Sequence, residues 1–200
     1  SKKVFIDLNA TDEEGRTAFF LAGVHEAQFA KTFDAKYSVV DLLLENSIEY
    51  GIQLNMQDES GETLLHRLTQ HGKKGRHVVH EKVLLASKNT SLDVNAPRFH
   101  DNRTPFHMAC FYGYPEVVKL FLTNAKELKI SINPRDADGL TPMHLACKNE
   151  RNNNFQFQLR TIRLMILTYA NELGIDLEAE DRNGESPTSY AQNHGFHHFF

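Results

Sequence analysis

The 200-residue sequence contains only two cysteines, Cys110 and Cys147, and no tryptophan. Two thiols are too few for a disulfide framework, which favours a reducing compartment, either cytoplasmic or nuclear. No apolar run approaches the roughly 18 residues that a membrane-spanning helix needs, so we expect no membrane insertion. The sequence also starts without a Met and without a charged-then-apolar leader, so we expect it to be a piece of a longer chain.

An excess of positive charge is also missing, because 22 basic and 26 acidic residues give a formal net charge of −4. This balance argues against a protein whose main role is to neutralise phosphates, and we expect no nucleic-acid partner. No glycine-rich phosphate loop, Gly-x-Ser-x-Gly elbow or Cys-x-x-Cys pair occurs. We therefore expect this segment not to be an enzyme and to carry no cofactor.

What the sequence does contain is an internal repeat. A short turn that opens with Asp and leads through Gly to Thr or Ser recurs at 12–17, 58–63, 136–141 and 181–186. A fifth copy, 101–104, has Asn in place of Gly, and Asn also tolerates a left-handed backbone. Two of these turns continue as Thr104-Pro105-Phe106-His107-Met108-Ala109-Cys110 and Thr141-Pro142-Met143-His144-Leu145-Ala146-Cys147.

These motifs resemble the ankyrin-repeat family, whose unit is a β-turn followed by two antiparallel helices with a Thr-Pro-Leu-His signature. The resemblance covers nearly the whole chain. It implies an all-α solenoid of helix-turn-helix pairs with β-turn or hairpin fingers. Thr is expected to cap the first helix of each pair, Pro to occupy its first turn, and His to bond backbone in the neighbouring turn.

The repeat boundaries predict one ankyrin-repeat domain over residues 1–200. We place the tail of a preceding repeat at 1–8, full repeats at about 9–54, 55–94, 95–132 and 133–177, and a partial repeat at 178–200. The repeats are longer than the family period of about 33 residues. About four extra residues follow each second helix, which we expect to add one helical turn. Insertions near 23–37, 72–76 and 149–158 follow first helices and should project from one edge of the stack.

The histidines and cysteines are explained by this repeat. His66, His107 and His144 occupy the signature position, where a structural role is expected. His194 and His198 have helical i, i+4 spacing, but no Cys, Asp or Glu follows Glu185, so the sequence predicts no metal site. Cys110 and Cys147 occupy equivalent sites in neighbouring first helices, about 8 to 10 Å apart, which is too far for a disulfide.

Helical periodicity indicates a candidate binding strip on the first helices. In the third repeat, Met108, Phe111 and Tyr112 share the face opposite the packed layer, and Leu145 and Lys148 are among their counterparts in the fourth. Followed along the stack, the first position of this set reads Leu21, Arg67, Met108, Leu145 and Tyr190. We predict an apolar concave surface, with burial of these side chains by the turns and second helices as the alternative.

The turns add charge beside this strip, because four of the five are net negative. Glu13, Glu14 and Glu59 are predicted partner contacts. Phe99 and His100, which lie where the third turn is one residue longer than the others, are predicted partner contacts as well. The expected partner is a protein or peptide with basic residues flanking an apolar anchor, docked across first helices and fingers.

Two further hypotheses stay open at this point. The segment is alternatively a targeting or regulatory module of a larger enzyme, channel or secreted effector, whose activity lies outside these residues. The repeat is also a candidate substrate, because Asn95 and the related Asn9, Asn55 and Asn133 resemble ankyrin asparagines that a hydroxylase modifies. Asparagine as a simple turn former is the alternative to that hypothesis.

Overall fold

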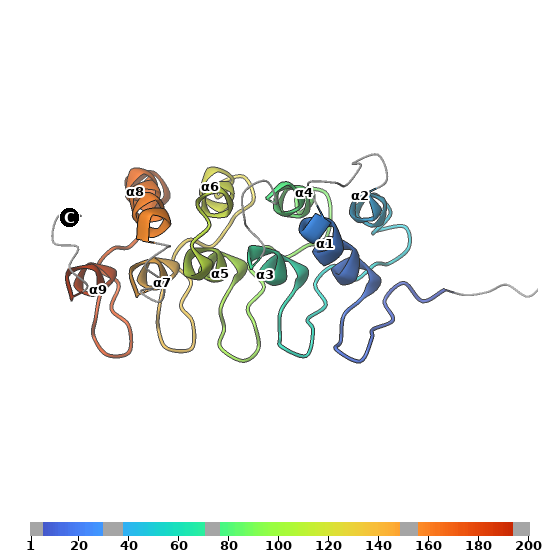
Figure 1. Ribbon diagram of the computed structural model, residues 1–200, viewed down its shortest axis with the longest axis horizontal. Coiled ribbons are helices and arrows are strands. Elements are labelled where there is room, and N and C mark those ends of the chain that lie inside the picture. Colours follow the sequence, from blue (N-terminus) through green and yellow to red (C-terminus); the bar gives the residue numbers. More distant parts are fainter. Residues whose placement is uncertain (1–5, 30–37, 71–76, 149–155, 194–200) are drawn as a thin grey trace, which may run out of the picture.

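The computed structural model describes residues 6–29, 38–70, 77–148 and 156–193, and within them every regular element is an α-helix. The helices form two layers along an elongated stack (Figure 1). The layer next to the fingers holds α1 (Ala18–Phe29), α3 (Leu64–Thr69), α5 (Pro105–Tyr112), α7 (Pro142–Lys148) and α9 (Pro187–Asn193). The other layer holds α2 (Val39–Glu45), α4 (Val78–Ala86), α6 (Pro115–Thr123) and α8 (Gln156–Leu173).

The signature Thr and His fix the start of the first-layer helices. At α5, the backbone N–H of His107 donates to Thr104 Oγ1, and the backbone N–H of Thr104 donates to His107 Nδ1. Pro105 occupies the first turn, where no amide hydrogen is needed. His66 and His144 make the same bond to the backbone of Thr63 and Thr141. The capping role predicted from the sequence is therefore confirmed.

The extra residues after the second helices behave differently from the prediction. They extend the helix only in α8, which has 18 residues, whereas α2, α4 and α6 have 7, 9 and 9. After those three helices the chain forms turns, and the expected extra helical turn is wrong there. At the end of α2, for example, Asn46 leaves helical geometry and the Ile52 N–H bonds back to the Ser47 carbonyl.

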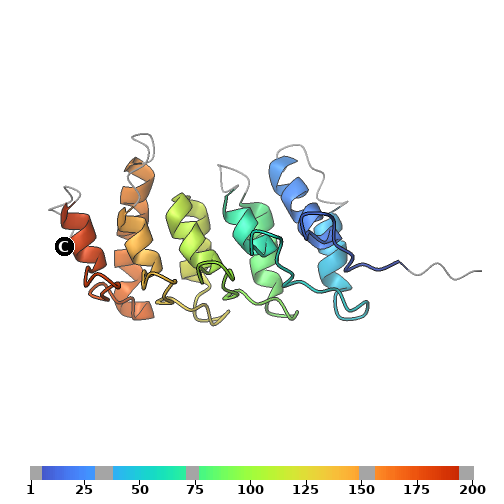
Figure 2. The ribbon, with the colours of Figure 1, turned by 90° about the horizontal axis from the view of Figure 1, so that it is seen from below.

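The predicted insertions lie mostly outside the described residues. Part of the first one is visible, because α1 has 12 residues while the other first-layer helices have 6 to 8. The helices α1, α3 and α7, after which the insertions follow, end on the same edge of the stack (Figure 2). Among the described residues, no helix combines the length and the hydrophobicity needed to cross a membrane.

Asparagine side chains at the start of four repeats join each of them to the next segment of the stack. Asn95 Nδ2 donates to the carbonyl of Lys129, 3.0 Å away, and its Oδ1 accepts from the N–H of Ser131 at 2.8 Å. Equivalent paired bonds are made by Asn9, Asn55 and Asn133. All four asparagines therefore have a structural role, which is to join two repeats rather than to form a turn, while hydroxylation of Asn95 stays a prediction.

Candidate binding surface

Each finger is a tight turn organised by its first aspartate. In the second finger, Asp58 Oδ1 accepts the backbone N–H groups of Ser60 and Glu62, and Gly61 adopts a φ of +73°. That left-handed conformation strains a residue with a side chain, which explains the recurring Gly. Asp12, Asp136 and Asp181 organise their fingers in the same way, and Asn102 takes the left-handed position in the third.

Neighbouring fingers are joined into a continuous ridge. The N–H of Glu59 donates to the carbonyl of Glu14 at 2.9 Å, which links the first finger to the second. Equivalent bonds run from Ala137 to Asp101 and from Arg182 to Asp138. Between the second and third fingers, the ring of Phe99 lies against Gly61, where a Cβ atom would approach ring carbon Cδ1 within 2.8 Å.

A chain of alternating charges crosses the second, third and fourth repeats behind this ridge. Arg67 pairs with the buried Asp58 and Glu62, and Arg98 bridges Glu62 and Asp101. The next ion pair joins Arg103 to the buried Asp136 at 3.0 Å. This network could not be predicted from the sequence, because Arg98 and Glu62 are 36 residues apart and no short-range sequence pattern links them.

This network limits what the fingers can offer a partner. Arg67 is half-buried and saturated by two carboxylates, so its predicted place in an apolar strip is wrong. Buried ion pairs are costly to break, because a single partner left behind is an uncompensated charge. The network therefore rigidifies the central fingers and does not present free charge.

Most of the predicted apolar strip is covered. Met108, Leu145 and Tyr190 are buried, so their predicted exposure on a concave face is wrong and the burial alternative holds. The Tyr190 hydroxyl donates to Asp181, and burial together with this bond raises the pKa of Tyr190 to about 12. The physical reason is that this helix position faces the preceding first-layer helix, as the edge contact between the Tyr190 and His144 rings shows.

The other predicted strip residues remain accessible in part. Phe111 and Tyr112 are half-buried, with ring centroids 5.3 Å apart in an edge arrangement. Partial burial and the nearby Glu62 carboxylate raise the pKa of the Tyr112 hydroxyl. Lys148 is exposed, with its ammonium group 5.5 Å from the centre of the Tyr190 ring. Leu21 is 40% exposed and lies at the end of the stack, away from this group.

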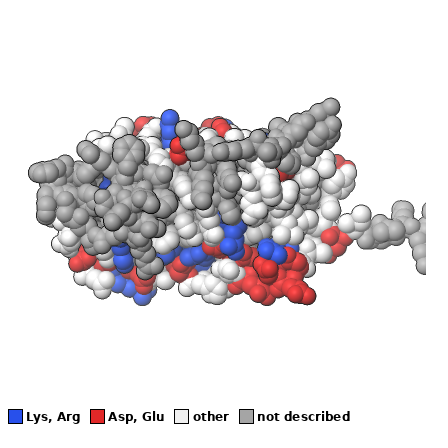
Figure 3. Space-filling model, in the orientation of Figure 1, with Lys and Arg blue, Asp and Glu red and all other residues white. Residues whose placement is uncertain are grey.

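The predicted acidic contacts are the most accessible side chains of the fingers. Glu13, Glu14 and Glu59 are all exposed, and acidic atoms gather over the first two fingers (Figure 3). Glu14 pairs with Arg16, whereas Glu13 and Glu59 form no ion pair with any described residue. Phe99 and His100 are also exposed, with ring centroids 4.1 Å apart, and the Phe99 ring lies against Gly61, two residues after Glu59.

The pKa shifts of the signature histidines and of the two cysteines follow from burial, which indicates structural rather than chemical roles. Burial lowers the pKa of His66 to about 4 and also lowers the pKa values of His107 and His144. Cys110 and Cys147 are free and buried, and burial raises the pKa of both thiols. Among the described residues, no cluster of three or more His, Cys, Asp or Glu side chains is arranged to hold a metal ion. The predicted histidine pair at 194 and 198 lies outside the described residues.

A stack of helix pairs with finger turns and a shared capping signature defines a repeat protein of the solenoid class. A family model of ankyrin repeats in three copies matches residues 30–136 and 77–163. The chain belongs to the ankyrin-repeat family.

Several proteins are similar to this chain. Alpha-latrotoxin-Lt1a from Latrodectus tredecimguttatus is 31% identical over 145 residues, which are 71% of this chain and 9% of the toxin. Rabankyrin-5 from Mus musculus is 27% identical over 144 residues, covering 66% of this chain and 10% of that protein. Transient receptor potential cation channel subfamily A member 1 from Homo sapiens is 29% identical over 157 residues, which are 78% of this chain and 12% of that protein.

Among solved structures, that of the ankyrin repeat protein EF0377 superimposes with a TM-score of 0.66. It is 20% identical and matches over 96% of this chain and 81% of its own, so the likeness is one of fold. The chain spans only about a tenth of the length of the first curated relatives that it matches.

Proposed function

We propose that this chain is a protein-recognition scaffold that docks a partner segment along the fingers of its first three repeats. Ankyrin repeats are generally protein-interaction modules, and their fold is typically non-catalytic. The observation that carries the proposal is the exposed Phe99, 59% accessible, whose ring packs against the finger that carries Glu59, a carboxylate without an ion pair to any described residue. Exposed aromatic area with unpaired charge is typical of a recognition site.

The composition of this surface defines the chemistry of the partner. Phe99 and His100 offer two exposed rings tilted by 54° to each other, and Glu13 and Glu59 lie on the first and second fingers. A matching segment carries an apolar anchor for the aromatic pair and Lys or Arg toward the first finger. The half-buried Phe111 and Tyr112 extend the surface onto α5. Met108 on α5, Leu145 on α7 and Tyr190 on α9 are buried and serve as packing.

The test uses synthetic peptides that place one Phe or Leu beside two or three Lys or Arg residues, with a charge-reversed set carrying Glu. Binding to the whole chain is measured by fluorescence polarisation over a range of salt concentrations. We expect the basic set to bind and the acidic set to fail. Glu59→Gln should weaken binding and flatten its salt dependence, because rim charges act mainly through steering.

A matched control removes the same charge elsewhere. Glu116 is exposed on α6, in the layer away from the fingers, so Glu116→Gln should leave peptide binding unchanged. Likewise, Phe99→Ala should weaken binding by about 1 to 3 kcal/mol if the ring is an anchor, whereas Ile48→Ala in an exposed turn should not. Equal losses for Glu59→Gln and Glu116→Gln would contradict the finger assignment.

A second candidate function is a targeting or regulatory module of a larger enzyme, channel or secreted effector. The observation in its favour is that the matched relatives include large toxins and a cation channel, of which this segment corresponds to about a tenth. We also propose a cytoplasmic or nuclear location, supported by the two free buried thiols. Sequencing the full-length transcript tests the targeting or regulatory role, because a catalytic or membrane region in it would favour that role over a stand-alone scaffold.

A further inference from the structure

The end of the stack formed by α1 and α2 exposes apolar side chains at positions that most of the other repeats bury. The exceptions among the counterparts are the half-buried Arg67 and Ile175. Val39 on α2 is 48% exposed. Its counterparts, which like Val39 lie 16 residues before the residue that opens the next repeat, are Val79, Val117 and Ile162, which are 4%, 0% and 0% exposed. The same kind of side chain is therefore present at this position, but no helix among the described residues covers Val39.

The first layer shows the same difference. Leu21, four residues after its signature Thr, is 40% exposed, whereas the equivalent Met108, Leu145 and Tyr190 are 2%, 2% and 8% exposed. This position faces the preceding first-layer helix, because the Arg67 guanidinium lies 6.0 Å from the centre of the Phe20 ring on α1. Leu21 therefore points to where a further helix would stand.

The segment before α1 repeats the pattern a third time. Ile6 is 78% exposed, while its counterparts Ile52, Leu92 and Ile130 are 5%, 8% and 6% exposed. Asn9, three residues on, already bonds the backbone of Gly51 and Gln53 as the other asparagines bond their next repeats. Residues 6–9 thus occupy the place of a repeat's end, without the helices that would cover Ile6.

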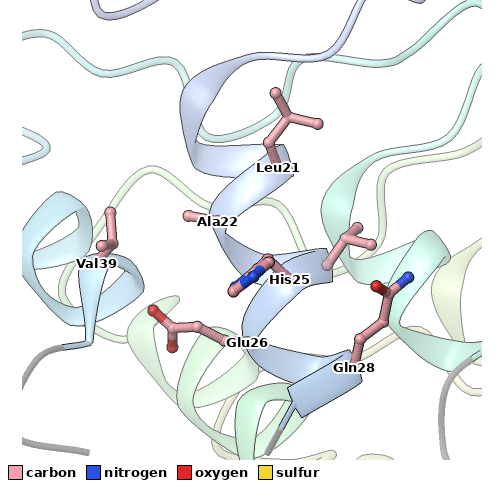
Figure 4. A pocket seen from close by; sticks show the side chains of 7 residues that line it. Leu21, Ala22, His25, Glu26, Gln28 and Val39 are labelled. Carbon is pink, nitrogen blue, oxygen red and sulfur yellow. The ribbon is translucent and has the colours of Figure 1, made fainter. Parts of the chain in front are cut away.

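An open cavity of about 550 Å³ lies on this face (Figure 4). Its wall is mostly apolar, with Leu21, Ala22 and Val24 from α1 and Val39 from α2. The carboxylate of Glu26 also reaches it, but Glu26 accepts from the Ser38 hydroxyl and the Val40 N–H and caps α2. The charge of Glu26 is therefore engaged within the repeat, and the surface left for a partner is mostly apolar, with His25 and Gln28 as its polar members.

We propose that this face binds a further ankyrin-type helix pair, stacked in register ahead of α1 and α2, with its second helix leading into Ile6. The face continues the interface that joins the other repeats, position by position, and an ankyrin pair presents the complementary apolar surface. The opposite end of the described stack contrasts with it. There the polar Thr188 stands where the other repeats have Phe19, Leu65, Phe106 and Met143, and it bonds the carbonyl of Leu177.

The proposal can be tested by fusing such a helix pair to the start of the stack. Residues 95–129 of this chain, which end where Ile130 begins the equivalent of Ile6, are fused ahead of residues 6–200. We expect the fusion to raise the Tm by several degrees and to slow amide exchange in α1 and α2 at least about tenfold, because stability in solenoids comes from neighbour interfaces. Circular dichroism reports whether the added pair is helical, and a pair that stays unstructured on this face overturns the proposal.

A substitution on the face gives the decisive comparison. Val39→Asp should change the Tm of the natural chain little, because the side chain is half exposed. In the fusion it should lower the Tm by roughly 4 to 8 °C, since it buries a charge. Ile48→Asp is the control, because Ile48 is 79% exposed and its counterparts Lys88 and Lys126 are exposed as well. Ile48→Asp should change the Tm of the natural chain and of the fusion by the same amount.

Two results would reject the assignment. The first is an equal effect of Val39→Asp in the natural chain and the fusion. The second is self-association of the natural chain that Val39→Asp abolishes in sedimentation measurements, which would make a second copy the occupant. Neither result bears on peptide binding by the fingers, so this inference and the proposed function fail separately.

Discussion

His66 Nε2 lies 2.9 Å from the carbonyl oxygen of Arg103, a residue one repeat further along the stack. The backbone N–H of Thr63 donates to the other ring nitrogen, Nδ1, so the proton resides on Nε2 and is donated to Arg103. The ring therefore has to be neutral to make both bonds. His107 and His144 make the same link to Leu140 and Glu185, so three repeat interfaces depend on neutral imidazoles.

This relationship predicts a loss of stability in mild acid. Burial lowers the pKa of His66 to about 4, from 6.5 in an unfolded chain. Between these values the unfolded state binds more protons, so the free energy of unfolding falls as the pH drops from about 6.5 toward 4. At pH 5, His66 alone should cost about 2 kcal/mol relative to pH 7.5. Urea melts at the two pH values measure the difference.

The control for this effect is a histidine that does not bond the backbone of a neighbouring repeat within the described residues. His66→Gln should reduce the dependence on pH between 7.5 and 5, while His25→Gln, at an exposed position on α1, should leave it unchanged. A chain that is as stable at pH 5 as at pH 7.5 would contradict the neutral, buried state of these rings.

Thr104 provides a separate prediction for helix capping. Its hydroxyl accepts the His107 N–H and also contacts His107 Nδ1 at 3.1 Å, so Thr104→Ala should lower the free energy of unfolding by about 0.5 to 2 kcal/mol. Thr123 is the matched control, because its exposed hydroxyl donates to carbonyls within its own helix and accepts from the side-chain amide of Asn124, but caps no backbone N–H among the described residues. Thr123→Ala should stay within about 0.5 kcal/mol. Equal effects in denaturant melts would count against the cap.

A pair of glycines tests the junction between the second and third fingers. Gly61 and Gly51 both have positive φ, at +73° and +60°, so replacing either with Ala should cost about 1 to 2 kcal/mol of backbone strain. Only Gly61 also faces an obstacle, the Phe99 ring, whereas nothing lies within 4 Å of a Cβ at Gly51. Gly61→Ala should therefore be the more destabilising by about 1 kcal/mol.

Thermal melts of both glycine variants, and of Gly61→Ala combined with Phe99→Ala, measure this difference. If the ring is the obstacle, the double variant removes the excess cost of Gly61→Ala over Gly51→Ala. An excess that persists without the Phe99 ring would show that the third finger does not pack on the second as described.

The parts of the fold that sequence could predict are those with local causes. The Thr104 cap, the Gly61 turn and the helix pairing follow from residues within a few positions of one another, and the structure confirms them. The extra residues after α2 were expected to be helical because their number matches a helical turn. Length alone does not decide this, because Asn46 bonds carbonyls of α2 and ends the helix.

The candidate site was less predictable, because it depends on contacts between repeats. Periodicity correctly separated the faces of α5, but it could not show that the preceding helix covers Met108 while Tyr112 stays half exposed. The ion pairs of Arg98 join residues from different fingers, and no local pattern indicates them. The exposure of the acidic residues was easier to predict, because Glu13 and Glu59 lie at turn positions that no helix can cover.

The last prediction concerns the two thiols. Cys110 and Cys147 are free and completely buried, and burial raises the pKa of both, that of Cys147 to about 11. Because the thiolate is the reactive form, alkylation at pH 8 should be at least about 100-fold slower in the folded chain than in urea. Intact mass after mild oxidation should show no loss of two hydrogens. Rapid labelling of the folded chain, or a disulfide between this pair, would mean that equivalent positions of α5 and α7 do not face the core as the structure describes.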